Sequence, residues 1–123
     1  MQPEFKSAYS TISWNGATLR ICPTGPHVGQ KEAPILAAEV EPYFKGIGKG
    51  VRHVVLELSA VQFMSSMGLG FLINCRTAAN NSGATPIVVG ANKELKGLLG
   101  MMKIDKFFKF VDDDAGLKSL IAK

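Results

Sequence analysis

Residues 53–70 read HVVLELSAVQFMSSMGLG, and this stretch decides the fold. Its first part, His53 to Leu58, is a nearly continuous apolar run, which is typical of a strand covered on both faces. A short loop and two adjacent serines follow, and the pattern from about Ser66 to Asn80 is helical. A buried strand that leads directly into a helix predicts an α/β sheet with parallel neighbours.

Upstream of this stretch, the pattern predicts an opening hairpin. Tyr9 to Trp14 and Thr18 to Cys22 are β-rich runs separated by Asn15-Gly16, a pair that suits a type I′ turn. From about Gln30 the apolar residues recur at helical spacing as far as residue 47. Pro42 lies inside this pattern and costs about 3 kcal/mol in an unkinked helix, so we expect a kink or break between Ala38 and Pro42.

Downstream, strands and helices continue to alternate. After a flexible link at residues 46–50 and a helix stop at Ser82-Gly83, the expected elements are a strand over Pro86 to Val89, a helix over Lys93 to Met101, a strand over Phe107 to Val111 and a helix over Asp114 to Ala122. We therefore predict one α/β domain spanning residues 1–123, with a mixed sheet of four to five strands, an N-terminal hairpin and about four helices.

Composition excludes several classes of protein. The 123 residues are 46% hydrophobic and 20% charged, enough for one core, and no apolar run approaches the roughly 20 residues that cross a bilayer. The start lacks the order of a signal peptide, so we expect a cytoplasmic protein without membrane insertion. Cys22 and Cys75 lie in apolar segments without metal-ligand spacing, which predicts buried free thiols and no cofactor.

The charged residues do not predict nucleic-acid binding or a metal site. The net charge of +4 is small, and the basic stretch from Lys93 to Lys109 is interrupted by acidic residues, as expected of a solvated face. Asp112-Asp113-Asp114 is explained by the preference for acidic residues at a helix start. His27 and His53 have no visible catalytic companions, so we do not expect an enzyme.

The serine pair at the start of the central helix has two readings. A serine side chain there caps free backbone N–H groups, and the positive helix end favours an anion such as a phosphate on the hydroxyl. In the simpler interpretation, the serine is only a helix cap, and the glycines allow the helix to pack closely on the sheet. Helical geometry predicts that an arc of the helix covers the sheet, namely Gly68, Phe71, Leu72, Cys75, Ala78 and Ala79. Leu69 and Ile73 lie outside this arc, where they either contact a partner or pack under a neighbouring helix.

Residues 63–70 also resemble a known family. FMSSMGLG is similar to the signature of STAS domains in bacterial anti-sigma factor antagonists, in which an aspartate and a serine precede a glycine, a leucine and a second glycine. The resemblance extends to the hairpin, to Thr24-Gly25, to Pro86 to Val89 with the helix after it, and to residues 98–108. It implies a STAS-like fold.

The resemblance also implies a functional site. In this family a partner kinase, which is also the anti-sigma factor, phosphorylates the serine that corresponds to Ser66, and Ser65 is a second candidate. The implied partner-binding residues are Met64, Ser65, Ser66, Met67, Gly68, Leu69 and Ile73. The chain departs from the family pattern at Ser65, which replaces the aspartate, at Met67, where the family prefers a small residue, and at Val28, which stands at an acidic position.

Two hypotheses of function follow from the resemblance. In the first, the chain is an anti-sigma factor antagonist that binds a kinase-type anti-sigma factor in a partner-switching pathway regulating transcription, and serine phosphorylation switches the binding. In the second, it is a non-phosphorylated STAS scaffold or a transporter-associated interaction module. A third class, a site for a phosphorylated ligand at the helix start, ranks last because no acid-base pair accompanies it. The sequence leaves a homo-oligomer open.

Overall fold

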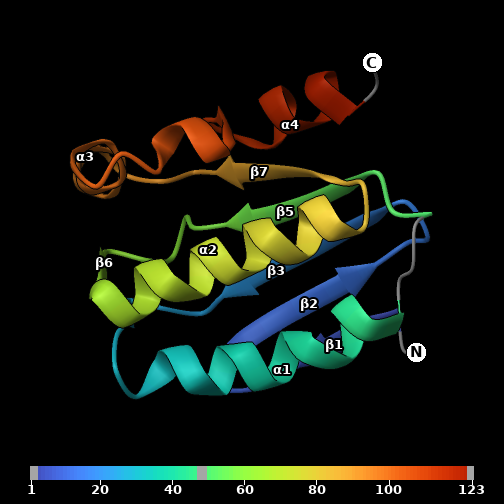
Figure 1. Cartoon of the computed structure of the whole chain (residues 1–123), viewed down its shortest axis with the longest axis horizontal. Coiled ribbons are helices and arrows are strands. Elements are labelled where there is room, and N and C mark those ends of the chain that lie inside the picture. The colour runs from blue at the N-terminus through green and yellow to red at the C-terminus, as the bar shows by residue number, and fades with distance from the viewer. Residues whose placement is uncertain (1–2, 47–49, 122–123) are drawn as a thin grey trace.

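A mixed β-sheet crosses the middle of the molecule in the computed structural model, which describes residues 3–46 and 50–121 (Figure 1). In this part of the chain the sheet has six strands in the order β1-β2-β3-β5-β7-β8. Their bounds are Glu4–Lys6, Ser10–Trp14, Thr18–Pro23, His53–Glu57, Thr85–Val89 and Lys109–Val111. The first three strands are antiparallel and the others join in parallel, which confirms the predicted mixed α/β sheet with an N-terminal hairpin.

The sheet has more strands than the four to five that we predicted. The additional strand is β1, whose Phe5 pairs with Ile12 of β2. Only three residues long, with one apolar side chain among them, β1 has no measurable periodicity. It forms because β2 has an unpaired edge, so its cause lies in the tertiary structure and not in the local sequence.

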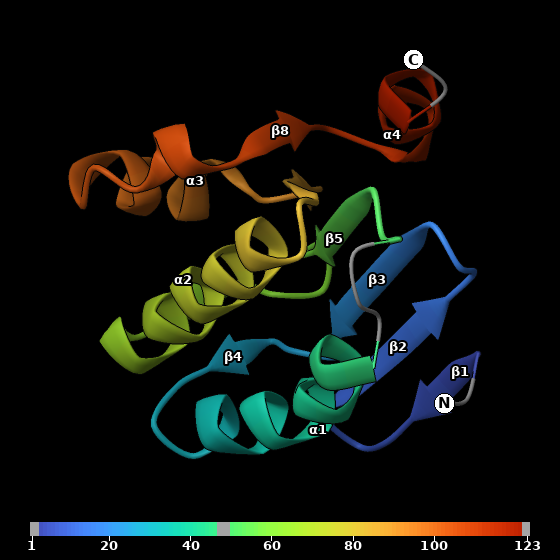
Figure 2. The same cartoon turned by 45° about the vertical axis from the view of Figure 1, so that its right-hand side comes forward.

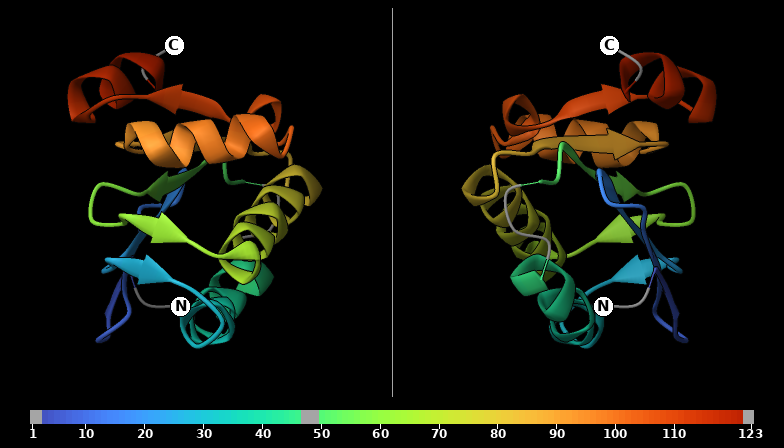
Figure 3. Two further views of the ribbon diagram at one scale, coloured as in Figure 1. Left: turned by 90° about the vertical axis from the view of Figure 1, so that its left-hand side faces the viewer. Right: turned by 90° about the vertical axis from the view of Figure 1, so that its right-hand side faces the viewer.

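The helices cover the sheet unequally. In the described residues the helices are α1 (Glu32–Gly46), α2 (Ser66–Asn81), α3 (Lys93–Met101) and α4 (Asp114–Ile121), with a 3₁₀ turn, η1, at Asp105–Phe107. α1 and α2 lie side by side on one face (Figures 2 and 3). On the other face, Leu117 of α4 packs against Val55, Ile87 and Val89. Since Val54 and Leu56 point into the larger core, β5 is covered on both faces, as predicted.

Three local predictions need correction. The hairpin turn is not type I′, because Gly16 has a left-handed φ of 93° and Asn15 does not. Instead, Asn15 Oδ1 accepts hydrogen bonds from the N–H groups of Ala17 (2.9 Å) and Thr18 (2.8 Å) in a three-residue loop. The last strand begins at Lys109 rather than Phe107, because Phe107 closes the turn η1.

The third correction concerns α1: of the predicted kink or break near Pro42, a break does not occur, because the helix continues through Pro42. Pro42 is exposed, while Val40 and Tyr43 beside it are buried in the core. Packing of the apolar face therefore outweighs the missing backbone hydrogen bond. Of the predicted link at residues 46–50, residues 47–49 lie outside the described part of the chain.

The two cysteines are free thiols, as predicted. Cys75 is buried, as predicted, whereas Cys22 is only half-buried, because it alternates with the core residue Ile21 and lies on the other face of β3. Burial raises the pKa of the Cys75 thiol, and burial together with the charge of Glu57 raises the pKa of Cys22. Each thiol therefore keeps its proton more tightly in the folded chain, and their contribution to stability falls as pH rises above the pKa of the unfolded thiol.

We expect the native protein to protect Cys75 from alkylation. Because thiolate is the reactive form and burial disfavours it, iodoacetamide at pH 8 should label Cys75 at least about tenfold more slowly than in guanidinium, with Cys22 labelled first. Mass spectrometry of peptides from timed samples measures both rates. Equal rates in the native and unfolded protein would show that Cys75 is open to solvent.

Candidate functional site

The serine pair lies at one end of the molecule, where the strand β6 (Phe63–Met64) leads into α2 (Figure 1). Ser65 is the N-cap of α2: its backbone is extended (φ −82°, ψ 179°), and its Oγ accepts a hydrogen bond from the N–H of Met67 at 3.2 Å. Ser66 is the first helical residue and is exposed. The predicted serine cap is therefore confirmed, with Ser65 as the capping residue and Ser66 at the positive helix end.

A second small sheet, which the sequence did not predict, fixes the position of residues 62–65, which we call the serine loop. β4 (His27–Val28) pairs in parallel with β6, with Val28 opposite Met64. The Pro26 carbonyl accepts hydrogen bonds from the N–H groups of Gln62 (2.7 Å) and Phe63 (3.1 Å), and the Val28 carbonyl accepts one from Ser65 (3.0 Å). Because this pairing ties the serine loop to the segment after β3, the serine pair has a fixed backbone.

Two glycines allow these segments to approach closely. Gly25 has a left-handed φ of 52°, and a Cβ there would overlap the carbonyl oxygen of Ala60. A Cβ on Gly68 would overlap the carbonyl oxygen of Val28, the same group that accepts the hydrogen bond from Ser65. The glycines therefore bring the Thr24-Gly25 segment and the start of α2 against the serine loop.

A carboxylate that the sequence analysis missed lies beside Ser65. Glu32, in the first turn of α1, accepts a hydrogen bond from the N–H of Gly29 through Oε1 at 3.0 Å. A Cβ built on Gly29 would lie 3.4 Å from this Oε1 and 3.8 Å from Ser65 Oγ, so both side chains lie around Gly29. Local sequence carries no signal for this, because Gly29 comes close to Ser65 only when β4 pairs with β6.

Exposure separates the predicted partner-binding residues into two groups. Ser66 and Met67 are exposed, and Ser65 and Ile73 are partly so, whereas Met64, Gly68 and Leu69 are buried. Leu69 is only 6% exposed and belongs to the core, so of the two alternatives packing holds for it rather than an exposed partner contact. It lies seven residues before Arg76, whose guanidinium stacks on Phe107, and so on the flank of α2 that faces away from α1. The predicted sheet-facing arc is buried, except that Ala78 is only partly buried.

Phe63 adds an exposed aromatic side chain to this surface. It is 57% exposed, Met67 is 47% exposed, and the two residues flank the serine pair in the sequence. The Phe63 ring meets the His27 ring edge-on, with the ring centres 6.3 Å apart. Exposed apolar side chains around a hydroxyl are typical of a surface that binds a protein partner. We call Phe63, Ser65, Ser66 and Met67 the serine surface.

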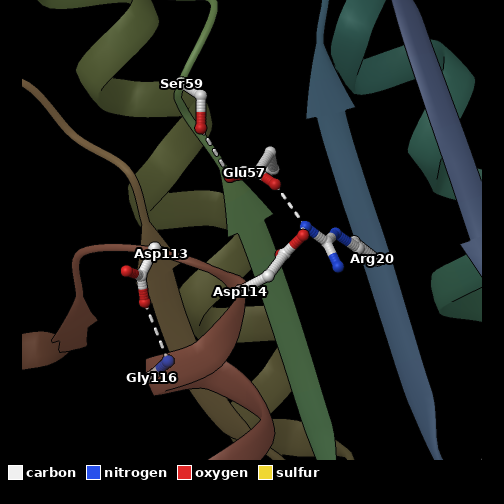
Figure 4. A network of polar contacts seen from close by, with 6 residues as sticks. All are labelled: Arg20, Glu57, Ser59, Asp113, Asp114 and Gly116. Atoms are coloured by element: carbon white, nitrogen blue, oxygen red, sulfur yellow. Dashed lines mark hydrogen bonds and ion pairs between the residues drawn. The ribbon is translucent and has the colours of Figure 1, made fainter.

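A polar network on the opposite face of the sheet has a structural role (Figure 4). Arg20 Nη2 contacts Glu57 Oε1 and also Asp114 Oδ1, the latter at 2.6 Å, and so joins β3 to β5 and to the start of α4. Glu57 also accepts a hydrogen bond from Ser59 at 2.7 Å. The hydrogen bond and charge of Arg20 lower the pKa of the Asp114 carboxyl.

The acidic run at residues 112–114 is divided among separate partners. Asp112 pairs with Lys96 at 2.9 Å, Asp113 accepts a hydrogen bond from the Gly116 N–H, and Asp114 pairs with Arg20. In the described residues no group of three or more histidine, cysteine or acidic side chains is placed to hold a metal ion. Over the same residues, each helix is too short or too polar to span a bilayer.

The class of protein is defined by the fold and the site together. The fold is a mixed sheet in which antiparallel N-terminal strands are followed by parallel βα units. In the site, a serine pair begins the helix that follows the central strand. The STAS domain family matches residues 27–115, which is most of the chain. The chain therefore belongs to the STAS domain family. No curated protein sequence matches it.

Solved structures share the fold at low sequence identity. An anti-sigma-factor antagonist (STAS) domain protein from Planctomyces limnophilus is 13% identical, with a TM-score of 0.81 over 93% of this chain and 98% of that one. The phosphorylated form of the Bacillus cell fate determinant SpoIIAA is 10% identical, with a TM-score of 0.68 over 90% and 98%. The murine solute carrier 26 family member A9 anion transporter is 12% identical, with a TM-score of 0.73 over 87% of this chain and 18% of the transporter.

Proposed function

We propose that this chain is an anti-sigma factor antagonist that acts in the cytosol as one STAS domain. It binds a kinase-type anti-sigma factor through the serine surface, without enzymatic activity of its own, and regulates transcription by switching partners. The observation that carries the proposal is the exposed Ser66 at the start of α2, flanked in the sequence by the exposed side chains of Phe63 and Met67. The structural similarity to anti-sigma factor antagonists supports the same partner class.

The geometry favours Ser66 over Ser65 as the phosphate acceptor. Ser65 Oγ is only partly exposed and already accepts the capping hydrogen bond from the Met67 N–H, so a phosphate there disrupts the cap. Ser66 is exposed and lies in the first turn, where a phosphate charge of about −1.5 to −2 is stabilised by the helix N-terminus.

Phosphate on Ser66 acts as a switch because of what surrounds it. A partner that binds the serine surface removes water from the Ser66 hydroxyl, which costs little. It would have to remove water from a phosphate there as well, and no residue of the serine surface carries a positive charge. Desolvation of an unpaired charge is costly, so phosphorylation weakens the complex.

We expect Ser66→Ala to keep the affinity for the anti-sigma factor and Ser66→Asp to weaken it at least about tenfold, or about 1.4 kcal/mol. Calorimetry with the kinase-type anti-sigma factor of the source organism measures both, and mass spectrometry after incubation with ATP locates the phosphate. Thr77→Asp is the matched control, because Thr77 is exposed three turns further along α2 and should not matter.

The alternative is a constant STAS scaffold or a transporter-associated module in which Ser66 is never modified. The neutral Ser65 at the position of the family aspartate and the bulky Met67 beside Ser66 favour it. Equal affinities for the two Ser66 variants, with no phosphate on Ser65 or Ser66, would decide for this alternative. Phosphate on Ser65 alone would keep the switch and overturn the choice of Ser66.

A further inference from the structure

The turn that ends α3 exposes two apolar side chains next to two cations, outside the serine surface. Met101 is 74% exposed and Met102 is 54% exposed, the former on the side of α3 that faces away from the buried Leu95 and Leu99. Lys103 and Lys106 follow, both exposed, and in the part of the chain that the structure describes neither forms an ion pair. We call Met101, Met102, Lys103 and Lys106 the methionine-lysine turn.

Three consecutive N–H groups of this turn are hydrogen-bonded to α3. The N–H of Met102 donates to the Leu98 carbonyl (3.0 Å), that of Lys103 to Gly100 (3.1 Å), and that of Ile104 to Leu99 (3.0 Å). The last two bonds are the pair that defines a Schellman helix end. Because these peptide groups are already paired, the turn can enter a medium of low polarity without leaving them unsatisfied.

Lys103 has a backbone conformation that favours glycine. Its φ is 60°, in the left-handed region, where a Cβ is unfavourable and where glycine commonly ends a helix. The chain thus places a cation at this point of the turn against the conformational preference of the backbone. Conformation alone does not account for lysine here, whereas a use for its charge does.

The residues that follow the two methionines are anchored in the core, so Met101 and Met102 stay exposed at the surface. Ile104 and Phe108 are buried in the core, and the Arg76 guanidinium lies 4.3 Å from the centre of the Phe107 ring. Residues 93–109 hold five lysines against two acidic residues, and therefore three of the four net positive charges of the chain. Lys96 pairs with Asp112, and the exposed Asp105 lies between Lys103 and Lys106 in the sequence. The predicted solvated basic segment thus keeps a net positive charge and carries exposed apolar side chains.

We propose that the methionine-lysine turn binds the surface of a membrane rich in anionic lipid. Met101 and Met102 enter the interface between headgroups and acyl chains, and Lys103 and Lys106 contact headgroup phosphates. α3 lies at the edge of the molecule (Figure 1), and its last residue, Met101, is 74% exposed. A lipid surface deforms around such a projecting group, whereas an acidic protein partner would need a matching hollow. This contact is peripheral and is independent of the proposed anti-sigma function.

Co-sedimentation with vesicles tests the proposal on the whole chain at low ionic strength. We expect binding to vesicles of equal parts phosphatidylglycerol and phosphatidylcholine, and none to phosphatidylcholine alone. Lys103→Gln with Lys106→Gln should weaken binding about thirtyfold, since each surface lysine contributes about fivefold. Met101→Ser with Met102→Ser should weaken it at least about tenfold. The control, Lys31→Gln with Lys118→Gln, removes the same charge from exposed positions elsewhere and should bind nearly as wild type does.

Lys103→Gly separates the cation from the stability of the turn. It should raise the melting temperature by about 4 °C by relieving the left-handed strain, and still weaken vesicle binding about fivefold. Absence of binding to phosphatidylglycerol vesicles overturns the proposal and leaves an acidic protein as the partner of this surface. The proposal is also overturned if the control lysine pair weakens vesicle binding as much as the Lys103 and Lys106 pair, or if the methionine pair does not weaken it. In either case net charge alone would explain the binding.

Discussion

Gly68→Ala is expected to lower the free energy of unfolding by about 2 kcal/mol and to weaken partner binding as well. A Cβ at this position would overlap the carbonyl oxygen of Val28, which is backbone in β4 and cannot rotate away. Overpacking of this kind costs about 1–3 kcal/mol, and here the upper end applies because the whole strand must shift; the helix preference for alanine offsets about 1 kcal/mol. Since the same carbonyl accepts the hydrogen bond from Ser65, the shift displaces the serine loop.

The control for this change lies two residues further along the same helix. A Cβ on Gly70 meets nothing within 4 Å, so Gly70→Ala should stabilise the protein by about 0.5–1 kcal/mol through helix preference alone. Urea unfolding followed by circular dichroism measures both variants. Equal stabilisation by the two alanines would show that α2 and β4 are further apart than the structure places them.

The second large effect is expected from Leu69→Ala, which should lower the free energy of unfolding by about 2–5 kcal/mol. Leu69 is 6% exposed within the core, and truncating a buried leucine loses its burial and leaves a cavity. Met67→Ala, two residues earlier at 47% exposure, should change stability by only about 0.5 kcal/mol or less and reduce partner affinity instead. The pair thus separates packing from recognition on neighbouring positions.

Chemical unfolding of the two variants, together with calorimetry against the anti-sigma factor, distinguishes these roles. A loss of about 0.5 kcal/mol or less for Leu69→Ala, with reduced affinity, would return Leu69 to the partner-binding surface. That outcome would contradict its burial in the core. An affinity unchanged by Met67→Ala would remove Met67 from the serine surface.

Much of the fold was predictable because it depends on local pattern. The apolar run of β5 indicates a strand covered on both faces, and the structure buries Val55 against α4 and Leu56 against the other helices. The bounds of α3 agree with the prediction at both ends, since Asn92 caps its start through the Leu95 N–H at 2.7 Å. The short elements β1, β4 and β6 escaped prediction because two or three residues carry no period.

By itself, the sequence determined the α/β class, the serine cap of α2 and the STAS family, because periodicity, capping chemistry and the residue order around Ser66 are local properties. Only the tertiary structure decided which of these residues a partner can reach. Leu69 is buried on the flank of α2 that carries Arg76 and faces Phe107, and Glu32 comes near Ser65 because β4 pairs with β6. Side-chain exposure depends on neighbours distant in sequence, and no helical arc drawn for one segment contains them.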